Sequence, residues 1–432
     1  MSLRGLYNIP SYADFGTTLA QGLLEADMDL ADALILLPNR RAGRTLQTTF
    51  LRLRDGEAML LPRMVPMGDL SDEDAVGEAI AGRIDADMLP DADLDLAEPW
   101  PKLRREAALA ELVAKTDATL SQDHVMALAQ ELARLMDQIE TEGLDAAKLP
   151  QLVEKTELAA HWEKSLRFLR ILYEVWPNVE DAAGYISPAK RRRLSIENQI
   201  RRWDLAPPTG PVIAAGSTGS IPATRKLLAA VLKLPQGAVV LPGMDPDLSA
   251  QAWAEIEHEI THPQYGFYEV LKACEQPPEA VQPWPWLPAR MQEPRTQLLS
   301  KAMLPAETTA SLTEGWRAGV QGLSVTAIEQ AFDDVTLYEL DDDDQEAQTI
   351  ALALRQGLDE PEFVSALVTP DRALAERVKG HLQRWAIEPD DSAGLRLEDA
   401  PAFKFARIVL DLIEGKADHF ALLSLLHHPL CQ

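Results

Sequence analysis

Residues Pro211 to Pro246 read PVIAAGSTGSIPATRKLLAAVLKLPQGAVVLPGMDP and carry the clearest fold pattern in this chain. PVIAAG is a short apolar run typical of a buried parallel strand, and it ends at the glycine-rich turn GSTGS. TRKLLAAVLKL then has apolar residues at helical spacing, with Pro222 at an early helical position and Ser220 as a candidate cap. AVVLPG is a second apolar run. The stretch therefore predicts a strand–helix–strand unit whose turn follows the carboxyl end of a strand.

The turn formed by Gly216, Ser217, Thr218 and Gly219 invites a phosphate-binding interpretation, because open parallel sheets bind ligands at the carboxyl ends of their strands. A working phosphate loop needs GxxxxGK[ST], whose lysine reaches the terminal phosphates and whose hydroxyl holds Mg²⁺. The glycine spacing here is too short, and no Gly-Lys-Ser or Gly-Lys-Thr occurs anywhere in the chain. A tight strand-to-helix turn is therefore the favoured interpretation.

Length and composition indicate a globular protein of two or three domains. The chain has 432 residues, of which 46% are apolar and 25% charged. No apolar run is long enough to span a membrane, and the start MSLRGLYNIP lacks a secretory apolar region. Cys274 and Cys431 lie too far apart in sequence to form a metal-ligand pattern. These features predict a soluble cytoplasmic protein without membrane contact.

The net charge of −27 argues against a protein that coats nucleic acid by bulk electrostatics. Any DNA contact is expected to be local, or to be made beside a more basic partner. The charge is unevenly distributed: residues 71–100 hold ten Asp or Glu and one Arg, whereas residues 190–202 hold six Lys or Arg and one Glu. The basic segment suits either a DNA or partner contact or a solvated helix face, and the solvated face is favoured.

The strand–helix alternation extends along most of the chain and predicts an α/β fold with parallel sheets of the P-loop type. GLYNIP, ALILLP and LLPRMVPMGDL are expected strands near the start, and VTLYEL and VSALVTP are expected strands near the end. A run of about four helical patterns separates the first strands from Pro211. We therefore predict a first α/β domain at 1–99 and 204–325, a helical insertion at 100–203, and the start of a truncated second α/β domain at 326–432.

Several residues resemble sites but have simpler interpretations. The four aspartates Asp341 to Asp344 cannot all face one ion from a helix start, so a solvated helix cap is favoured over a metal site. His427 and His428 lack a third ligand nearby. Trp284 and Trp286, between prolines that forbid regular structure, suit either base stacking or apolar anchoring of a loop, with anchoring favoured. No catalytic triad can be assembled from spacing, so no catalytic residue and no metal site are predicted.

LLPNRRAGRTL, AAGSTGSIPATRKLL, LPQGAVVLPGMDP, HPQYG and LVTPDRALAERV together resemble AddB in its alphaproteobacterial form. AddB is the partner subunit of the AddAB helicase–nuclease, which processes broken DNA ends. The resemblance covers nearly the whole chain, and the pair AGSTGSIPAT and LPGMDP is specific. It implies a superfamily 1, UvrD-like helicase fold with a decayed ATP site. It also implies two partners: an AddA-like helicase–nuclease subunit and single-stranded DNA at broken ends. In the family, this half of the subunit helps to recognise a regulatory sequence in that DNA.

The resemblance also assigns roles to individual residues. PSYADFGTT, with Gly16 and Thr17, takes the place of the Walker A loop and lacks its lysine, and the turn after PVIAAG lacks the acidic pair that would hold Mg²⁺. Thr369 stands where a phosphate-sensing arginine would be, with Arg372 nearby. The segments that resemble motifs Ia and III supply the expected DNA-binding residues: Asn39, Arg40, Arg41, Arg44, Asp245 and Gln251.

The resemblance implies a chain without ATPase or nuclease activity of its own. The family's nuclease domain, with its Mg²⁺ and iron–sulfur cluster, would belong to a carboxyl-terminal half that follows this segment, so no cofactor is expected here. The expected function is that of an inactive helicase-like scaffold that binds single-stranded DNA and supports its partner. Two alternatives stay open: an ATP-binding enzyme with an atypical phosphate loop, and a protein interaction module without DNA contact.

Overall fold

The structure is a computed structural model that describes residues 3–67, 96–145, 148, 168–288, 294–305, 324–360, 363–392, 394, 397, 400–413, 415 and 418–431. The chain divides into two compact units, Met1–Asp333 and Asp334–Gln432. The first unit contains a parallel sheet with its helices and a helical part; the second contains helices only among its described residues.

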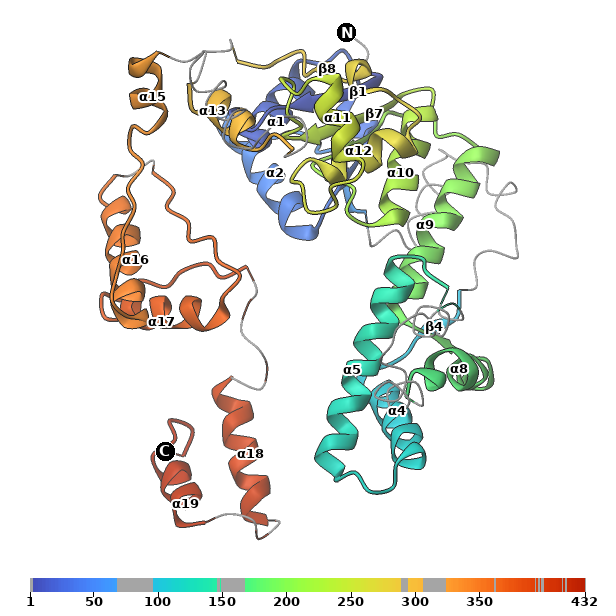
Figure 1. Cartoon of the computed structure of the whole chain (residues 1–432), viewed down its shortest axis with the longest axis vertical. Helices are drawn as coiled ribbons and strands as arrows, with labels where there is room; N and C mark the ends of the chain where they lie inside the picture. The colour runs from blue at the N-terminus through green and yellow to red at the C-terminus, as the bar shows by residue number, and fades with distance from the viewer. Residues whose placement is uncertain are drawn as a thin grey trace. The chain divides into compact units, whose positions relative to one another are not determined.

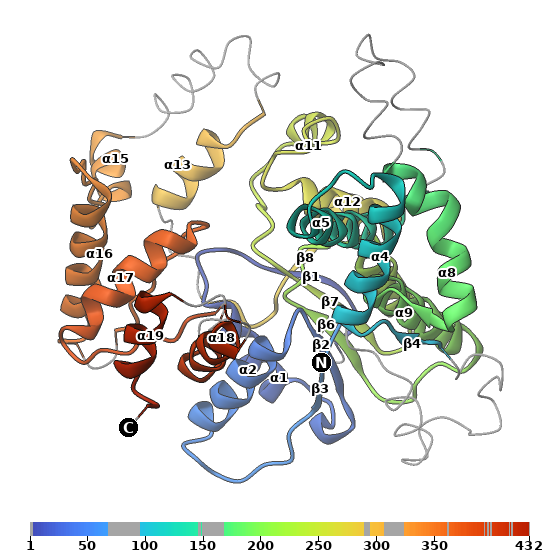
Figure 2. The same cartoon turned by 90° about the horizontal axis from the view of Figure 1, so that it is seen from below.

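The first unit is built on a six-stranded sheet in which every paired strand is parallel to its neighbour. The strand order is β3-β2-β6-β7-β1-β8, as Figure 2 shows. Five of the six strands confirm the sequence prediction, and the coarse α/β class is confirmed with them. The strands are β1 (Gly5–Ile9), β2 (Leu34–Leu37), β3 (Arg63–Pro66), β6 (Val212–Ala215), β7 (Gly237–Pro242) and β8 (Gln282–Pro283).

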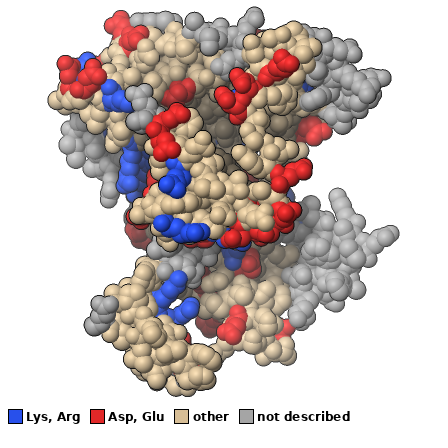
Figure 3. Space-filling view, turned by 90° about the vertical axis from the view of Figure 1, so that its left-hand side faces the viewer, with Lys and Arg blue, Asp and Glu red and all other residues tan. Residues whose placement is uncertain are grey.

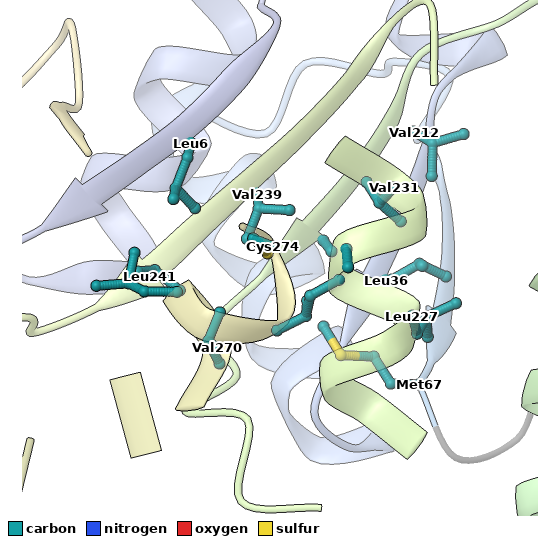
Figure 4. Close-up of a cluster of buried hydrophobic side chains, with 14 of the residues drawn as sticks. Leu6, Leu36, Met67, Val212, Leu227, Val231, Val239, Leu241, Val270 and Cys274 are labelled. Atoms are coloured by element: carbon teal, nitrogen blue, oxygen red, sulfur yellow. The ribbon is translucent and has the colours of Figure 1, made fainter. Parts of the chain in front are cut away.

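Helices cover both faces of the sheet, which explains why its central strands are continuous apolar runs. α1 (Phe15–Glu25) and α2 (Arg40–Leu53) pack on one face through Leu23 and Phe50. α9 (Pro188–Leu205), α10 (Pro222–Lys233) and α12 (Tyr265–Ala273) pack on the other, where Leu227 and Val270 meet the strands. Figure 4 shows this second layer, with Cys274 buried among leucines and valines.

Two helix starts test the capping predictions. The side chain of Asn39 accepts a hydrogen bond from Ala42 N at 2.9 Å and caps α2, as predicted. The predicted Ser220 cap is wrong: Ile221 is the N-cap residue of α10, and Pro222 is the first helical residue. Pro222 fixes the start of the helix because its φ angle suits that position and its missing N–H would have had no helical partner. Ser220 therefore lies one residue before the cap.

The predicted proline-rich loop contains a correction. Gln282–Pro283 form β8, which pairs in parallel with Tyr7 and Asn8 of β1 at the edge of the sheet, where a proline is tolerated. Trp284 follows it and is buried at 1% exposure, so it anchors the segment as predicted and is closed to base stacking. Its indole N–H donates to the Thr18 carbonyl at 3.1 Å.

The helical part lies between β3 and β6 in sequence and contains a small ladder. Its helices are α4 (Lys102–Thr116), α5 (Gln122–Thr141), the π-helix η4 (Ile171–Val175), α8 (Trp176–Ala183) and α9, shown in Figure 1. β4 (Glu98–Pro99) and β5 (Tyr185–Ile186) form a two-stranded parallel ladder that the sequence did not predict. The stretch SLTEGWRAGVQGL, whose helical pattern predicts a helix at 311–323, lies outside the described residues, as does most of the acidic segment at 71–100.

Shorter elements complete the first unit. η1 (Leu30–Asp32) precedes β2, and η5 (Pro278–Ala280) precedes β8. α11 (Ala250–Ile256) follows β7 and buries Trp253 in the same core cluster as α10 and α12. α13 (Pro294–Ala302) and α15 (Val325–Ala331) pack against each other near the end of the unit.

The second unit corrects the prediction of another parallel sheet. Among its described residues no strand forms: residues 335–340 and 363–369 belong to no helix and no strand. Leu337, Val364 and Val368 are 84%, 89% and 94% exposed, so these runs lack the covered faces that a parallel strand needs. The small core is helical and joins α16 (Asp343–Gly357) to α17 (Arg372–Gln383) through Ala351 and Val378.

The remaining helices of this unit expose apolar side chains. α18 (Pro401–Ile413) and α19 (His419–Leu426) have no buried residue, and Ile413 and Phe420 are among their exposed side chains. The lower part of Figure 3, where these helices lie, is largely uncharged. Among the described residues, no helix is both long enough and apolar enough to cross a membrane.

Candidate functional site

The strand order creates a crevice between the carboxyl ends of β2 and β6. The chain leaves β2 through α2 toward β3, and leaves β6 through α10 in the opposite direction toward β7. Because α2 and α10 cover opposite faces of the sheet, the two connections diverge at this point. Ligands of open parallel sheets bind at such topological switch points. The position of the crevice therefore follows from topology alone.

A cleft of about 470 Å³ lies at this point. After β2, Asn39 and Arg40 line it; after β6, Gly216, Ser217 and Thr218 line it. These residues come from two segments with separate sequence signatures, the motif Ia-like segment and the glycine-rich turn. The structure brings them together at one edge of the sheet.

The helical part supplies two further arginines to the cleft, Arg192 and Arg193 of α9. Arg193 pairs with Glu140 at 3.2 Å and with Glu197 at 3.3 Å, so acidic neighbours partly neutralise it. The exposed guanidinium of Arg192 has no hydrogen-bond or ion-pair partner in the part of the chain that the structure describes. With Arg40, the cleft thus concentrates positive charge in a chain whose net charge is −27.

The glycine-rich turn is held rigidly at the floor of the cleft. Gly216 and Gly219 have φ angles of +81° and +66°, in the left-handed region that glycine tolerates. A Cβ on Gly219 would lie 2.0 Å from Val270 Cγ2, so α12 packs directly on the turn. Arg225 donates to the Gly219 carbonyl at 3.0 Å and pairs with Glu269 of α12 at 3.4 Å. The turn is therefore fixed before any ligand arrives.

The amino terminus of α10 opens into the same cleft. Ser220, Ala223 and Thr224 line it, and none of the described side chains caps the helix. The first N–H groups of a helix have no partner within the helix and carry a partial positive charge. Hydroxyls, uncapped N–H groups and guanidinium groups are donors that suit phosphate oxygens. The cleft is chemically suited to a phosphate-bearing ligand.

The amino terminus of α1, which the resemblance places at the Walker A loop, is occupied differently. Asp14 caps the helix, and its carboxylate accepts from Thr17 N at 2.7 Å. Hydrogen bonds from Thr17 hold the pKa of Asp14 below its ordinary value, and the charge of Arg52 lowers it further. An ionised carboxylate thus occupies the position where a nucleotide phosphate would accept hydrogen bonds from the N–H groups at the helix start. Gly16 and Thr17 form part of a capped helix start.

We expect Asp14→Ala to lower the free energy of unfolding by about 1 kcal/mol at neutral pH, because the Thr17 N–H loses its acceptor. The lowered pKa means that this contribution is complete above the ordinary carboxyl pKa and is lost as pH falls through the folded-state value. The difference between wild type and variant in urea unfolding should therefore shrink below about pH 4. Asp14→Asn keeps an acceptor and should show a smaller difference at neutral pH, and this difference should also shrink at low pH because both variants lack the titrating carboxylate. Equal losses in both variants at neutral pH would contradict the capping role.

The motif III-like residues lie at a neighbouring position rather than in the cleft. Asn8 of β1 exchanges two hydrogen bonds with Met244, at 2.7 and 3.0 Å, and fixes the loop after β7. Asp245 lines a separate cavity of about 130 Å³, and its carboxylate accepts from Asp247 N. Gln251 is exposed on α11. Arg41 and Arg44 are exposed on α2 and do not line the cleft.

The two candidates of the second unit are held by neighbours within that unit. Arg372 donates to both carboxylate oxygens of Asp391, at 2.9 and 2.8 Å, and pairs with Glu376 at 3.0 Å. These contacts raise the pKa of Arg372, with the Asp391 hydrogen bond as the main cause. The Thr369 hydroxyl accepts from Asp371 N at 3.1 Å. Both side chains therefore form contacts at the amino terminus of α17.

Metal and nucleophile chemistry find little support among the described residues. No group of three or more His, Cys, Asp or Glu there is placed to hold a metal ion. Asp342, in the aspartate run, caps α16 by accepting from Asp344 N and Gln345 N, as predicted. Burial raises the pKa of the Cys274 thiol to about 11, so it is protonated at neutral pH and is a poor nucleophile.

Arg192 and Arg193 are the cleft residues that the predicted site omitted. The basic run 190–202 is evident in the sequence, but its pattern alone favours a solvated helix face. The local composition shows that this segment is basic. Where α9 packs in the fold depends on contacts between residues that are far apart in sequence. The packing of α9 on α10 brings these arginines to the cleft.

No family model matches this chain, and no curated protein sequence matches it. The cleft and the residues that line it therefore carry the functional conclusion.

Proposed function

We propose that this chain is a helicase-like scaffold without ATPase activity that binds single-stranded DNA through the cleft between β2 and β6. The observation that carries the proposal is the convergence of Asn39 and Arg40, the turn at Gly216, and Arg192 and Arg193 around one cleft at a topological switch point. Most of the polar groups that line the cleft are hydrogen-bond donors, and hydrogen-bond donors bind the phosphate oxygens of a DNA backbone.

The cleft reconciles DNA binding with the acidic composition. Arg40 and Arg192 are exposed and offer guanidinium groups to a single strand, although the chain as a whole repels polyanions. Binding then depends on local contacts and on counterion release rather than on net charge. The resemblance to AddB supports a partner that is an AddA-like helicase–nuclease acting on broken DNA ends, whose own charges would add to the affinity.

The same geometry argues against ATP hydrolysis. The Asp14 carboxylate caps the helix after β1, where incoming phosphates would meet its negative charge. The glycine-rich turn after β6 carries no lysine and no carboxylate that could hold Mg²⁺. These two turns therefore provide neither a lysine that could contact the phosphates of a nucleotide nor a carboxylate that could bind its Mg²⁺ ion.

The test is the binding of a single-stranded oligonucleotide by the chain, measured by fluorescence anisotropy at about 50 and 200 mM salt, with and without Mg²⁺–ATP. We expect affinity to fall steeply with salt and to be unchanged by ATP. Binding that requires ATP would restore the enzyme alternative. If no binding is seen at either salt concentration, alone or with an AddA-like partner, the proposal fails in favour of an interaction module.

The interaction-module alternative has one specific observation in its favour. Leu410 and Ile413 of α18 and Phe420, Leu423 and Leu426 of α19 are more than half exposed. Contiguous exposed apolar side chains are typical of surfaces that are covered by another polypeptide. A partner contact there is compatible with DNA binding in the first unit, so the two functions are tested separately.

A further inference from the structure

A network of ion pairs lies beside the cleft at β2 and β6 and connects the helical part to the helices that cover the sheet. Arg193 of α9 pairs with Glu140 of α5 at 3.2 Å and with Glu197 of α9 at 3.3 Å. Glu197 also pairs with Lys226 of α10 at 3.5 Å. α5 and α9 pack against each other, as Figure 1 shows, so charged side chains join three helices at this point.

Arg193 is the member of this network that lines the cleft, together with Thr141, the last residue of α5. Its side chain is 26% exposed, and its Nε atom is buried without a hydrogen-bond partner among the described residues. Polar contact with a ligand therefore falls to the two Nη groups. The network already holds both of them, because Nη2 donates to Glu140 and Nη1 donates to Glu197.

The two carboxylates hold Arg193 in different ways. Glu197 follows Arg193 by one turn of α9, so this pair lies within a single helix, and Lys226 shares the charge of Glu197. Glu140 belongs to α5, so its pair with Arg193 lasts only while α5 packs on α9. Water and salt reach the Glu140 side chain, which is 31% exposed, and weaken its pair. The Glu140 pair is therefore the one that an incoming anion can replace.

A phosphate oxygen is a close chemical substitute for the Glu140 carboxylate. Both are anionic acceptors for guanidinium N–H groups and form charge-assisted hydrogen bonds of similar strength. The exchange leaves the Glu197 pair in place, and the released Glu140 carboxylate is exposed enough to be solvated by water. The phosphates present in the cleft thus decide which anion Arg193 binds.

From these contacts we propose that Glu140 is a positioning residue that regulates the cleft, because it competes with a DNA phosphate for the Nη2 group of Arg193. The proposal rests on the proposed function, since the cleft must bind DNA for the competition to occur. A phosphate that takes Arg193 also breaks a contact between α5 and α9. Coupling of this kind is reciprocal, so a partner that draws α5 away from α9 raises the affinity of the cleft for DNA.

The test measures binding of a single-stranded oligonucleotide to Glu140→Gln by fluorescence anisotropy over a range of salt concentrations. Affinity should rise about fivefold at about 0.1 M salt, because a neutral amide competes less well for a guanidinium group than a carboxylate does. The freed Arg193 neutralises one further phosphate. The slope of log affinity against log salt should therefore steepen by about 0.7.

Two further measurements separate this effect from a general change in charge. Glu142→Gln is the matched control: it removes the same charge at the end of the same helix, from an exposed residue that does not line the cleft. Its salt slope should equal that of the wild type. In an Arg193→Gln background, Glu140→Gln removes a repelling carboxylate but frees no guanidinium group, so the slope should again stay constant.

The outcomes distinguish this inference from the proposed function. If the wild type binds the oligonucleotide but Glu140→Gln has the wild-type slope, only the competition between Glu140 and phosphate is refuted. A steeper slope that persists in the Arg193→Gln background refutes it as well. If neither the wild type nor Glu140→Gln binds, the proposed function fails and this inference fails with it. Should Glu140→Gln fail to fold, Glu140→Asp withdraws the carboxylate by one methylene group and should steepen the slope in the same direction.

Discussion

Replacing Trp284 with alanine is expected to lower the free energy of unfolding of the first unit by about 3–5 kcal/mol. Trp284 is 1% exposed and packs edge-on against Tyr7 with ring centroids 5.5 Å apart. Its indole N–H bonds to Thr18 O, and its backbone N–H bonds to Asn8 O. The ring therefore connects the sheet edge to α1, and its loss leaves a cavity that the rigid neighbours cannot fill.

The measurement is urea unfolding followed by circular dichroism, compared with two control variants. Trp286→Ala removes a half-buried neighbour whose ring lies 5.5 Å from that of Trp284, and it should cost much less. Trp284→Phe keeps an aromatic ring but loses the N–H donor, so its loss should fall between those of the two alanine variants. A Trp284→Ala midpoint close to that of Trp286→Ala would show that the segment after β8 is not a structural anchor.

The β8 segment also shows where local sequence rules reach their limit. Pro283 and Pro285 predict irregular structure, because proline lacks the N–H that a sheet ladder uses. At the outer edge of a sheet that donor is not needed on the solvent side, so Gln282–Pro283 can pair with β1. The prediction failed because edge position is a property of the whole sheet, which no local pattern contains.

The inner strands were predictable for the opposite reason. PVIAAG and AVVLPG are fully apolar, and only a strand covered on both faces makes such a run favourable. VTLYEL and VSALVTP look similar in sequence, yet their side chains are exposed in the second unit and no ladder forms there among the described residues. An apolar run thus indicates a candidate inner strand of a parallel sheet, but neighbouring strands and covering helices decide whether that strand forms.

The candidate site was predictable in the half that belongs to the sheet. Asn39, Arg40 and the turn at Gly216 follow strand ends, and strand ends of a parallel sheet meet at one edge. Arg192 reaches the cleft from a helix inserted between the strands in sequence, and its register relative to the sheet depends on long-range packing. The basic character of that helix was predictable from the sequence, but its position beside this cleft was not.

Removing the two exposed cleft arginines together, in Arg40→Ala with Arg192→Ala, should weaken single-stranded DNA binding about 20-fold at about 0.1 M salt. Each arginine that neutralises a phosphate releases condensed counterions, and for a single strand each contact contributes a slope of about −0.7 to the dependence of log affinity on log salt. The double variant should therefore also reduce the magnitude of that slope by about 1.4.

The matched control is Arg44→Ala with Arg191→Ala, which removes the same net charge from the same two helices at residues that do not line the cleft. Because the control leaves the cleft intact, its affinity and salt slope should stay close to those of the wild type. Equal weakening in the two double variants would mean that DNA responds only to overall charge, and the cleft would lose its assigned role. Weakening by the control alone would move the DNA path onto the outer face of α2, where Arg44 is exposed. A reduced slope confined to the cleft variant is the result that only direct phosphate contact at β2 and β6 explains, since a fold defect would lower affinity without removing a fixed number of counterions.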